Sequence, residues 1–545
     1  MSNVTNLEKA AAKLAKGDKT RTPSGGTFDS FGRRVIRHDA GKLPEILDAC
    51  EAAIAERALE LNVFSYANRL ARIYQASKLV DDGVKRAAGA VMVHPIEAPL
   101  ARELIARAAV HEKYDGRAGN YKIIDPPRTV AEALLARGHW PGLPELSGFI
   151  ECPTVTLDGR IIDAPGYDAQ TGLFGAFAEI PGYRRPAEHP TQDEAEMAVA
   201  ALLELFKTFP FVSDADRVAM LASVLTAIVR RVLSSAPLVG MDAPMPGTGK
   251  TLLLETLAII STNRRASVLS LGHDDAETEK RLTGVLLAGD AVIGIDNVER
   301  PLKGDLLCQV ATQQYVRLRP LGATAMLNVP THALIVATGN NLSIVGDLKR
   351  RVIMIRLDAK TERPEHRAFD VDHLAIVTAR RGEIIAHALT IIRAYLAAGA
   401  PAVAGLHAYG SFESWDRMVR RPLAWLGLPD PLTTSEALRE NDPDLEAMRL
   451  LLAAWFSRFG SAPQIAADVV SAAMETAPMS GERINPDLYD ALQLACNEKP
   501  NARRLGEWLR RHRDRRVDDL GIQQTGADSH RKVKRWIVAR AGSAG

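Results

Sequence analysis

Residues 237–260 read PLVGMDAPMPGTGKTLLLETLAII, and this stretch decides the fold. An apolar run (237–241) is followed by the glycine-rich segment PGTGKT (246–251) and then by an apolar run with helical spacing. Glycines let successive backbone N–H groups converge on phosphate oxygens, and a following helix directs its positive end at the same anion. The stretch therefore predicts a strand, a phosphate-binding loop and a helix.

The loop supplies the candidate nucleotide-binding residues, which are Gly247, Thr248, Gly249, Lys250 and Thr251. We expect Lys250 to reach the β- and γ-phosphates of ATP, and the Thr251 hydroxyl to bind Mg²⁺. The usual pattern G-x-x-x-x-G-K-[ST] has glycine at the position that Pro244 occupies here. A glycine-rich turn with a chance Lys-Thr pair is the alternative, and the flanking strand and helix patterns disfavour it.

Short apolar runs alternate with helical stretches between residues 237 and 357, and these runs are PLVGM, ASVLSL, AVIGID, ALIVAT and RVIMIRL. Such alternation is typical of a parallel sheet that is covered by helices. The predicted fold class is an α/β P-loop ATPase core with a parallel sheet. An α+β and helical N-terminal region precedes this core, and a helical region and a basic C-terminal domain follow it.

The second candidate motif is AVIGIDN (residues 291–297), an apolar strand that ends in a carboxylate. At the carboxyl end of a strand beside a phosphate loop, Asp296 would hold the water shell of Mg²⁺. Many P-loop ATPases have glutamate at the next position to polarise the attacking water, but Asn297 carries an amide that cannot accept a proton. Nothing beyond proximity in the sequence assigns the role of substitute base to Glu299.

Two further segments carry candidate catalytic residues. The strand-like run ALIVATGNN (residues 333–341) would deliver Asn340 beside the nucleotide, where its amide could sense the γ-phosphate; a strand ending in an Asx turn is an equal alternative. Paired arginines, Arg350 and Arg351, precede the next strand. Such a pair is more often a solvated helix end, but in a ring ATPase an arginine from a neighbouring subunit can neutralise the transferring phosphoryl group.

Residues 315–327 (YVRLRPLGATAML) predict a hairpin with its turn near Gly322. A hairpin inserted here could project into a central pore, with Arg317 and Arg319 on its charged face as candidate DNA contacts. An edge hairpin with solvated arginines is equally consistent, because the turn itself carries no Lys or aromatic residue that would grip DNA.

As a set, these motifs resemble the helicase part of phage and mobile-element primase-helicases, which are AAA+ ATPases related to the superfamily 3 helicases. The resemblance rests on PMPGTGKT, EKRLTGVLLAGDAVIGIDNVERPL and VATGNNLSIVGDLKRRVIMIRLDAKTERPE, and it extends over residues 43–541. By this resemblance the Walker A, Walker B, sensor and arginine-finger residues would be Lys250 with Thr251, Asp296, Asn340, and Arg350 or Arg351. It also implies ATP and Mg²⁺ as cofactors, DNA as a partner, and self-association into a homo-oligomeric ring, expected to be a hexamer.

Charge is distributed unevenly along the chain. The 545 residues have a net charge of only +2, but residues 501–545 hold twelve Lys or Arg against five acidic residues, a net charge of +7. Asn501 is a plausible N-cap for a basic helix that is followed by two strand-like runs, which is the order of a winged helix. The candidate DNA-binding residues here are Arg503, Arg504, Arg510, Arg511, Lys532 and Lys534. A solvated, arginine-rich terminal helix is the alternative.

Composition excludes a disordered chain and a small disulfide-stapled fold, because 46% of the residues are hydrophobic and 25% are charged. The cysteines are far apart in the sequence, at Cys50, Cys152, Cys308 and Cys496. No zinc site or disulfide framework is therefore expected, and a reduced, intracellular compartment is the expected location. The resemblance to phage and mobile-element primase-helicases implies that this is the cytoplasm of a bacterial or phage-infected cell. We find no secretory signal and no membrane span in the sequence, so no membrane partner is expected.

The expected domains are an N-terminal helix and linker (1–42), an α+β domain (43–190), a helical connector (191–236), the AAA+ core (237–360), a helical region (361–462) and a winged helix (463–545). The first functional hypothesis is a ring-forming, ATP-dependent DNA helicase or translocase for replication of a phage, plasmid or integrated mobile element. A separate primase or replication protein is a candidate partner, because no acidic motif or zinc cluster predicts a primase site. The alternative is an AAA+ remodeller or helicase loader that binds a protein and tethers to DNA without unwinding it. A nucleotide-binding scaffold with feeble hydrolysis is a third hypothesis, because of Pro244 and Asn297.

Overall fold

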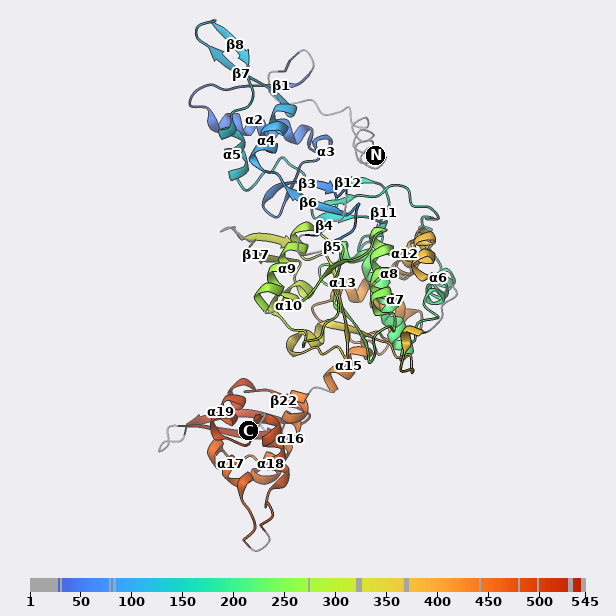
Figure 1. Ribbon diagram of the computed structural model, residues 1–545, viewed down its shortest axis with the longest axis vertical. Coiled ribbons are helices and arrows are strands. Elements are labelled where there is room, and N and C mark those ends of the chain that lie inside the picture. Colours follow the sequence, from blue (N-terminus) through green and yellow to red (C-terminus); the bar gives the residue numbers. More distant parts are fainter. Residues whose placement is uncertain are drawn as a thin grey trace. The chain divides into compact units, whose positions relative to one another are not determined.

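The chain forms two compact units, Met1–Ser435 and Glu436–Gly545, in a computed structural model (Figure 1). The structure describes residues 28–29, 32–77, 80–81, 85–272, 275–319, 326–366, 372–440, 443–478, 481–496, 499–527 and 533–540. The helix expected near the N-terminus lies outside these residues. None of the described helices is both long and apolar enough to cross a membrane.

A sheet with five parallel strands forms the centre of the first unit. These strands are β14 (Leu238–Ala243), β15 (Ser267–Leu269), β16 (Val292–Ile295), β19 (Leu334–Asn340) and β20 (Val352–Arg356). Their order is β20-β14-β19-β16-β15, and every neighbouring pair is parallel, which confirms the predicted parallel sheet. Because β20 lies on the other side of β14 from the remaining strands, the strand order reverses at β14. In open α/β sheets, ligands bind at the carboxyl ends of the strands beside such a reversal.

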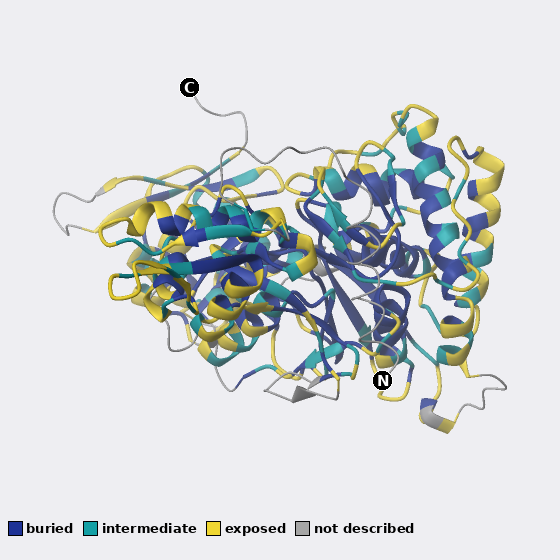
Figure 2. Ribbon diagram, turned by 90° about the horizontal axis from the view of Figure 1, so that it is seen from above, coloured by how far each residue is buried: buried dark blue, intermediate teal, exposed yellow. Residues whose placement is uncertain are grey.

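Helices enclose this sheet, so that its strands are buried while the outer helical faces are exposed (Figure 2). The α-helices are α6 (Gln192–Leu205), α7 (Asp214–Val229), α8 (Lys250–Thr262), α9 (Asp275–Ala288), α10 (Asp305–Thr312), α11 (His373–Ala379), α12 (Arg381–Ala397), α13 (Glu413–Trp415), α14 (Arg421–Trp425) and α15 (Thr433–Glu440). Short 3₁₀ or π segments are η1 (Arg230–Val232), η2 (Gly346–Arg351), η3 (Pro364–His366) and η4 (Asp416–Arg420).

Two of the helix starts follow local rules that the sequence already displays. Thr191 caps α6 in a reciprocal capping box with Glu194, as its position before an apolar helical run predicts. Ser213 caps α7, and its hydroxyl accepts a hydrogen bond from the backbone N–H of Asp216. α7 is buried almost throughout, which identifies it as a core helix.

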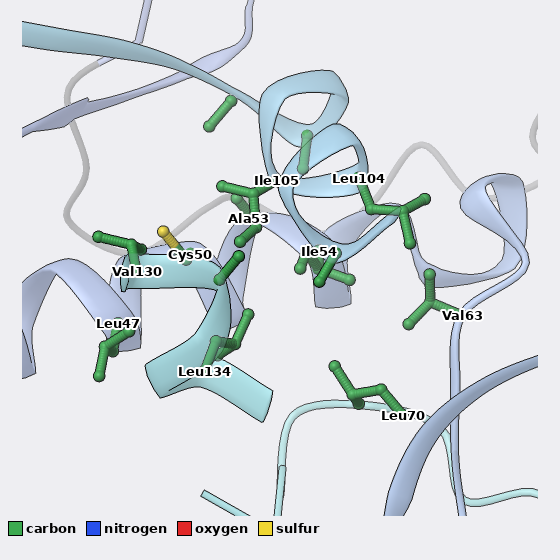
Figure 3. Close-up of a cluster of buried hydrophobic side chains, with 14 of the residues drawn as sticks. Leu47, Cys50, Ala53, Ile54, Val63, Leu70, Leu104, Ile105, Val130 and Leu134 are labelled. Carbon is green, nitrogen blue, oxygen red and sulfur yellow. The ribbon is translucent and has the colours of Figure 1, made fainter. Parts of the chain in front are cut away.

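The described part of the N-terminal region of the first unit combines small sheets with four helices. Its elements are β1 (Arg34–Arg37), α2 (Leu43–Glu56), α3 (Ala58–Leu61), β2 (Phe64–Tyr66), β3 (Arg69–Gln75), β4 (Val80–Asp81), β5 (Lys85–Arg86), β6 (Val91–Pro95), α4 (Ala98–Ala108), β7 (Ala109–Asp115), β8 (Asn120–Ile123), α5 (Arg128–Ala136), β9 (Gly148–Ile150), β10 (Thr154–Val155), β11 (Ile161–Ile162), β12 (Gly166–Asp168) and β13 (Leu173–Gly175). Apolar side chains of α2, α4 and α5 pack together in its core, with Cys50, Ile54, Ile105 and Leu134 among them (Figure 3). Burial raises the pKa of the Cys50 thiol to about 12, so this cysteine behaves as a core residue.

Three features of this region go beyond the sequence expectations. β1, which lies in the segment expected as helix and linker (1–42), pairs in parallel with β7. Residues 166–168 form β12, which pairs with β13. β4 and β5 extend the edge of the central sheet beyond β15. A buried ion pair between Arg86 of β5 and Asp290, which precedes β16, stabilises this arrangement (2.9 Å). The Asp158-Gly159 turn joins β10 to β11, which pair antiparallel.

The second unit is a helical bundle backed by an antiparallel sheet. Its elements are α16 (Pro443–Phe459), β21 (Gln464–Ile465), α17 (Ala466–Met474), α18 (Pro486–Cys496), α19 (Ala502–Arg511), β22 (Arg516–Val517), β23 (Leu520–Ala527) and β24 (Lys534–Arg540). The sheet order is β21-β24-β23-β22. Trp455 of α16 packs in the same core as Trp508 and Trp536. The unit therefore includes α16, which the sequence expectation assigned to the preceding helical region.

Candidate functional site

The connection from β14 to α8 contains two glycines with positive φ angles. Gly247 has φ +75° and Gly249 has φ +106°, and glycine adopts such values at little cost. A β-carbon on Gly249 would lie 3.0 Å from the Phe209 ring, so the loop is also packed too tightly there for a side chain. Because α8 begins at Lys250, its unpaired first-turn N–H groups lie at the end of the loop.

Lys250 is buried and hydrogen-bonded at this loop. Its ammonium donates to Asn340 Oδ1 at 2.7 Å, and to the Met245 carbonyl and Thr248 Oγ1 at 3.4 Å each. Burial lowers the pKa of Lys250, while the charges of Asp242 and Asp296 act in the opposite direction. A partly desolvated cation with neutral hydrogen-bond partners is well suited to receive a phosphate.

β19 places Asn340 beside β14 by its register. Ala243 and Asn340 form the last pair of the β14–β19 ladder, and the chain then turns at Asn341, which has φ +53°. The Leu342 N–H donates to Asp242 Oδ1 at 2.7 Å and fixes this turn. Since Asn340 Oδ1 accepts from Lys250, its amide NH₂ group remains to donate to an anion.

Asp296 and Thr251 provide the oxygen atoms that suit Mg²⁺. Asp296 follows β16 and is partly exposed, and Thr251 is exposed in the first turn of α8. Thr338 Oγ1 donates to Asp296 Oδ1 and accepts from the backbone N–H of Asn297 at 3.2 Å. Carboxylate and hydroxyl oxygens are hard ligands of the kind that Mg²⁺ prefers. These residues therefore fit the metal that the sequence predicts.

Thr338 is a site residue that the sequence reasoning missed. It precedes Asn340 by two positions on the same strand, so both side chains lie on the same face. The two-residue spacing between Thr338 and Asn340 is the sequence feature from which Thr338 could have been predicted.

Asn297 and Glu299 form a short turn after Asp296. Asn297 has φ +54°, and its amide donates to Glu299 Oε1 at 2.9 Å. Both residues are exposed.

The two predicted arginines have different surroundings. The side chain of Arg351 is 11% exposed and donates to the Asp347 carboxylate, the Cys308 carbonyl (3.1 Å) and Thr312 Oγ1 (2.6 Å). The side chain of Arg350 is 49% exposed and pairs with Asp347. Hydrogen bonds from these arginines lower the pKa of Asp347 to about 2. Arg351 is thus held by contacts within its own chain, whereas Arg350 is accessible to solvent.

The predicted hairpin is present as β17 (Tyr315–Leu318) and β18 (Leu327–Pro330), which pair antiparallel. Arg317 and Arg319 are exposed, while Val316 and Leu318 are buried. The turn with Gly322 lies outside the described residues.

In the second unit, Asn501 caps α19 as predicted, and its side-chain oxygen accepts from the backbone N–H groups of Arg503 (2.8 Å) and Arg504 (3.4 Å). Leu505, Trp508 and Leu509 are buried on one face of the helix. The predicted DNA-binding residues that are exposed are Arg503, Arg504, Arg510, Arg511 and Lys534. Lys532 lies outside the described residues.

No protein-family model matches the sequence, and no curated protein does so either. Among solved structures, the A form apo structure of the NrS-1 C-terminal region is 11% identical with a TM-score of 0.37, over 82% of this chain and 100% of that chain. A further apo structure of that region is 12% identical with a TM-score of 0.37 and the same coverage. SCCmec type IV Cch, described as an active helicase, is 13% identical with a TM-score of 0.30, over 88% of this chain and 97% of that chain. The case for function therefore rests on this chain's own geometry.

Proposed function

We propose that this chain is an ATP-driven, ring-forming AAA+ DNA helicase or translocase that serves the replication of a phage, plasmid or integrated mobile element. The observation that carries the proposal is the convergence of a lysine, a hydroxyl, a carboxylate and an amide at the carboxyl ends of β14, β16 and β19. These residues are Lys250, Thr251, Asp296 and Asn340. The strand order, which reverses at β14, supports a ligand site at this edge.

ATP would bind with its phosphates at the loop before α8. The backbone N–H groups and Lys250 would neutralise the phosphate oxygens, and the Asn340 amide would donate to the γ-phosphate. Mg²⁺, held through Thr251 and Asp296, would supply further charge neutralisation. Arg350 of a neighbouring subunit is the proposed arginine finger, because its guanidinium is half exposed.

The same strand that carries Asn340 is joined to the hairpin, which supports a coupling between ATP and DNA. Residues 331–333 connect β18 to β19. The buried Arg230 side chain donates to the carbonyls of Thr331 (2.5 Å) and Ala333 (3.0 Å) within this connection. A firmly held connection of this kind would transmit a displacement of β19 to the hairpin, where Arg317 and Arg319 would contact a DNA strand.

The second unit is proposed to be a winged helix that binds duplex DNA. The exposed arginines of α19 would meet the major groove or the phosphates, and the β23–β24 hairpin would form the wing. The test is the salt dependence of duplex binding. Replacing Arg511 with Ala should reduce the slope of log K against log salt by about one if the residue contacts one phosphate.

An unwinding assay with forked DNA tests the main proposal. The wild-type chain should unwind the fork with ATP, and Lys250→Ala should abolish both ATP turnover and unwinding. The exposed Lys207, which pairs with Glu204, offers a matched control as Lys207→Ala. ATP turnover without unwinding would instead favour the remodeller or helicase loader. Unchanged ATP turnover in Lys250→Ala would refute the site.

A further inference from the structure

Many P-loop ATPases use a carboxylate directly after the Walker B aspartate to activate water, but this chain has Asn297 directly after Asp296. We propose that Glu299 is the carboxylate that accepts the proton of the attacking water, and that Asn297 is the positioning residue that holds it. The inference rests on the proposed ATP hydrolysis and names the base of that reaction.

The first observation is the contact between the two side chains. Asn297 Nδ2 donates to Glu299 Oε1 at 2.9 Å. Asn297 adopts a left-handed backbone (φ +54°), which asparagine tolerates better than most residues. This turn brings the position two residues later within reach of the amide. One Glu299 oxygen is thereby fixed, and Oε2 remains for a water molecule.

The second observation is that the segment carrying Glu299 is held against the end of β19. The Val298 N–H donates to the Thr338 carbonyl at 2.7 Å, and a β-carbon on Gly339 would lie 2.9 Å from the Val298 carbonyl oxygen. Leu302 continues the pairing, since its N–H donates to the Ser343 carbonyl at 2.8 Å. Glu299 therefore lies on a fixed segment that runs beside the strand delivering Asn340, the residue bonded to Lys250.

The third observation concerns the other carboxylates around the loop, which have partners of their own. Asp242 Oδ1 accepts from the Leu342 N–H at 2.7 Å. Glu255 is buried in α8 and accepts from the Ala266 N–H at 2.9 Å. Asp296 accepts from Thr338 and is the proposed metal ligand. Glu299, in contrast, is exposed and is held by a neutral amide, so its carboxylate can accept a proton without losing a charged partner.

The proposed step is balanced as follows. The water oxygen forms a bond to the γ-phosphorus while the bond from that phosphorus to the β–γ bridging oxygen breaks, and ADP departs with the bond's electron pair. The water proton passes to Glu299 Oε2 and is released to solvent after phosphate leaves. General-base catalysis of this kind contributes about 10²- to 10⁴-fold to the rate.

The test uses the full chain and ATP itself, with turnover and ATP binding measured separately. Glu299→Gln should lower kcat by about 100-fold or more and change ATP affinity by less than about 3-fold. Asn297→Gly keeps the left-handed turn but removes the amide, so it should lower kcat by about 10-fold while ATP affinity changes by less than about 3-fold. Glu196 is a matched control, because it is exposed and accepts from the Gln192 side-chain amide at 3.0 Å. Glu196→Gln should retain wild-type turnover.

The outcomes separate this inference from the proposed function. If Lys250→Ala abolishes turnover while Glu299→Gln stays within about 3-fold of wild type, the base assignment is overturned and the ATPase stands. Loss of ATP binding in Glu299→Gln would also overturn it, because the residue would then act on binding. If the wild-type chain does not hydrolyse ATP, the proposed function itself fails.

Discussion

Replacing Gly249 with alanine should damage the proposed nucleotide site through two separable effects. Gly249 has φ +106°, and an alanine held in a left-handed conformation costs about 1–2 kcal/mol. The new β-carbon would also lie 3.0 Å from Phe209 Cε1 and 3.2 Å from Phe209 Cδ1. Forcing an extra methyl group into such a contact costs about 1–3 kcal/mol. We therefore expect Gly249→Ala to destabilise the native conformation of the loop and the first turn of α8 by about 2–5 kcal/mol of free energy.

Two measurements report this cost. Hydrogen exchange gives the opening free energy of α8, and equilibrium titration gives the affinity for ATP, which should fall by at least about 10-fold. Phe209→Leu in the Gly249→Ala background removes the ring contact but not the backbone strain, so it should restore only part of the loss. Gly284 of α9 has open space around its β-carbon position, and Gly284→Ala should be neutral or stabilising by up to about 1 kcal/mol.

Wild-type rates of hydrogen exchange in α8 together with wild-type affinity for ATP in Gly249→Ala would refute both effects. Complete restoration of both quantities by Phe209→Leu would show that the backbone contribution is absent. Equal losses in Gly284→Ala would show that the effect is a general property of glycine replacement rather than of this loop.

Three further predictions concern charged groups. Arg351→Ala should lower Tm, because it removes a nearly buried guanidinium from its partners. Arg350→Ala should leave Tm unchanged and abolish ATP turnover. If Arg350 acts on the ATP of a neighbouring subunit, mixing Arg350→Ala subunits with Lys250→Ala subunits should restore part of the turnover. Burial lowers the pKa of His111 from 6.5 to about 4, so the unfolded chain binds more protons between these values. The N-terminal region should lose about 3 kcal/mol of stability as pH falls from about 6.5 to about 4, measured by hydrogen exchange of α2 and α4. Asp290→Asn should remove the negative charge that pairs with the buried Arg86 and cost about 3–5 kcal/mol, measured as the opening free energy of β15 and β16 by hydrogen exchange. An unchanged value would show that β5 is held by other contacts.

Local patterns were sufficient to predict the central sheet. Each of the five parallel strands coincides with an apolar run. Four of them are largely buried, and a strand buried on both faces needs continuous apolar sequence, whereas β15 is only partly buried. The caps at Thr191 and Asn501 were predictable for a similar reason, since a cap depends only on residues within the first turn.

Long-range packing decided what the sequence could not predict. β5 joins the central sheet through Arg86 and Asp290, which are 204 positions apart, and a two-residue strand has no periodicity. The helical pattern of α16 was readable, but the pattern does not say that Trp455 packs with the core of the second unit. Likewise, Arg350 and Arg351 are the same residue type, and only the contacts with Cys308 and Thr312 distinguish them.

The pairing of Lys250 with a neutral amide has an energetic consequence under the proposed function. The hydrogen-bond partners of Lys250 are neutral, and the nearest that an incoming phosphate would displace is Asn340 Oδ1 at 2.7 Å. That hydrogen bond has a net value of about 1.5–3 kcal/mol, because one partner is charged. Separating the lysine from a buried carboxylate would cost about 3–5 kcal/mol instead. The exchange frees the Asn340 amide to turn toward the γ-phosphate, and its strand continues back to the connection that Arg230 holds. Binding of ATP could then displace β19 and the attached hairpin with little loss of free energy. We therefore predict that Asn340→Asp weakens ATP binding and uncouples any remaining ATP turnover from DNA unwinding.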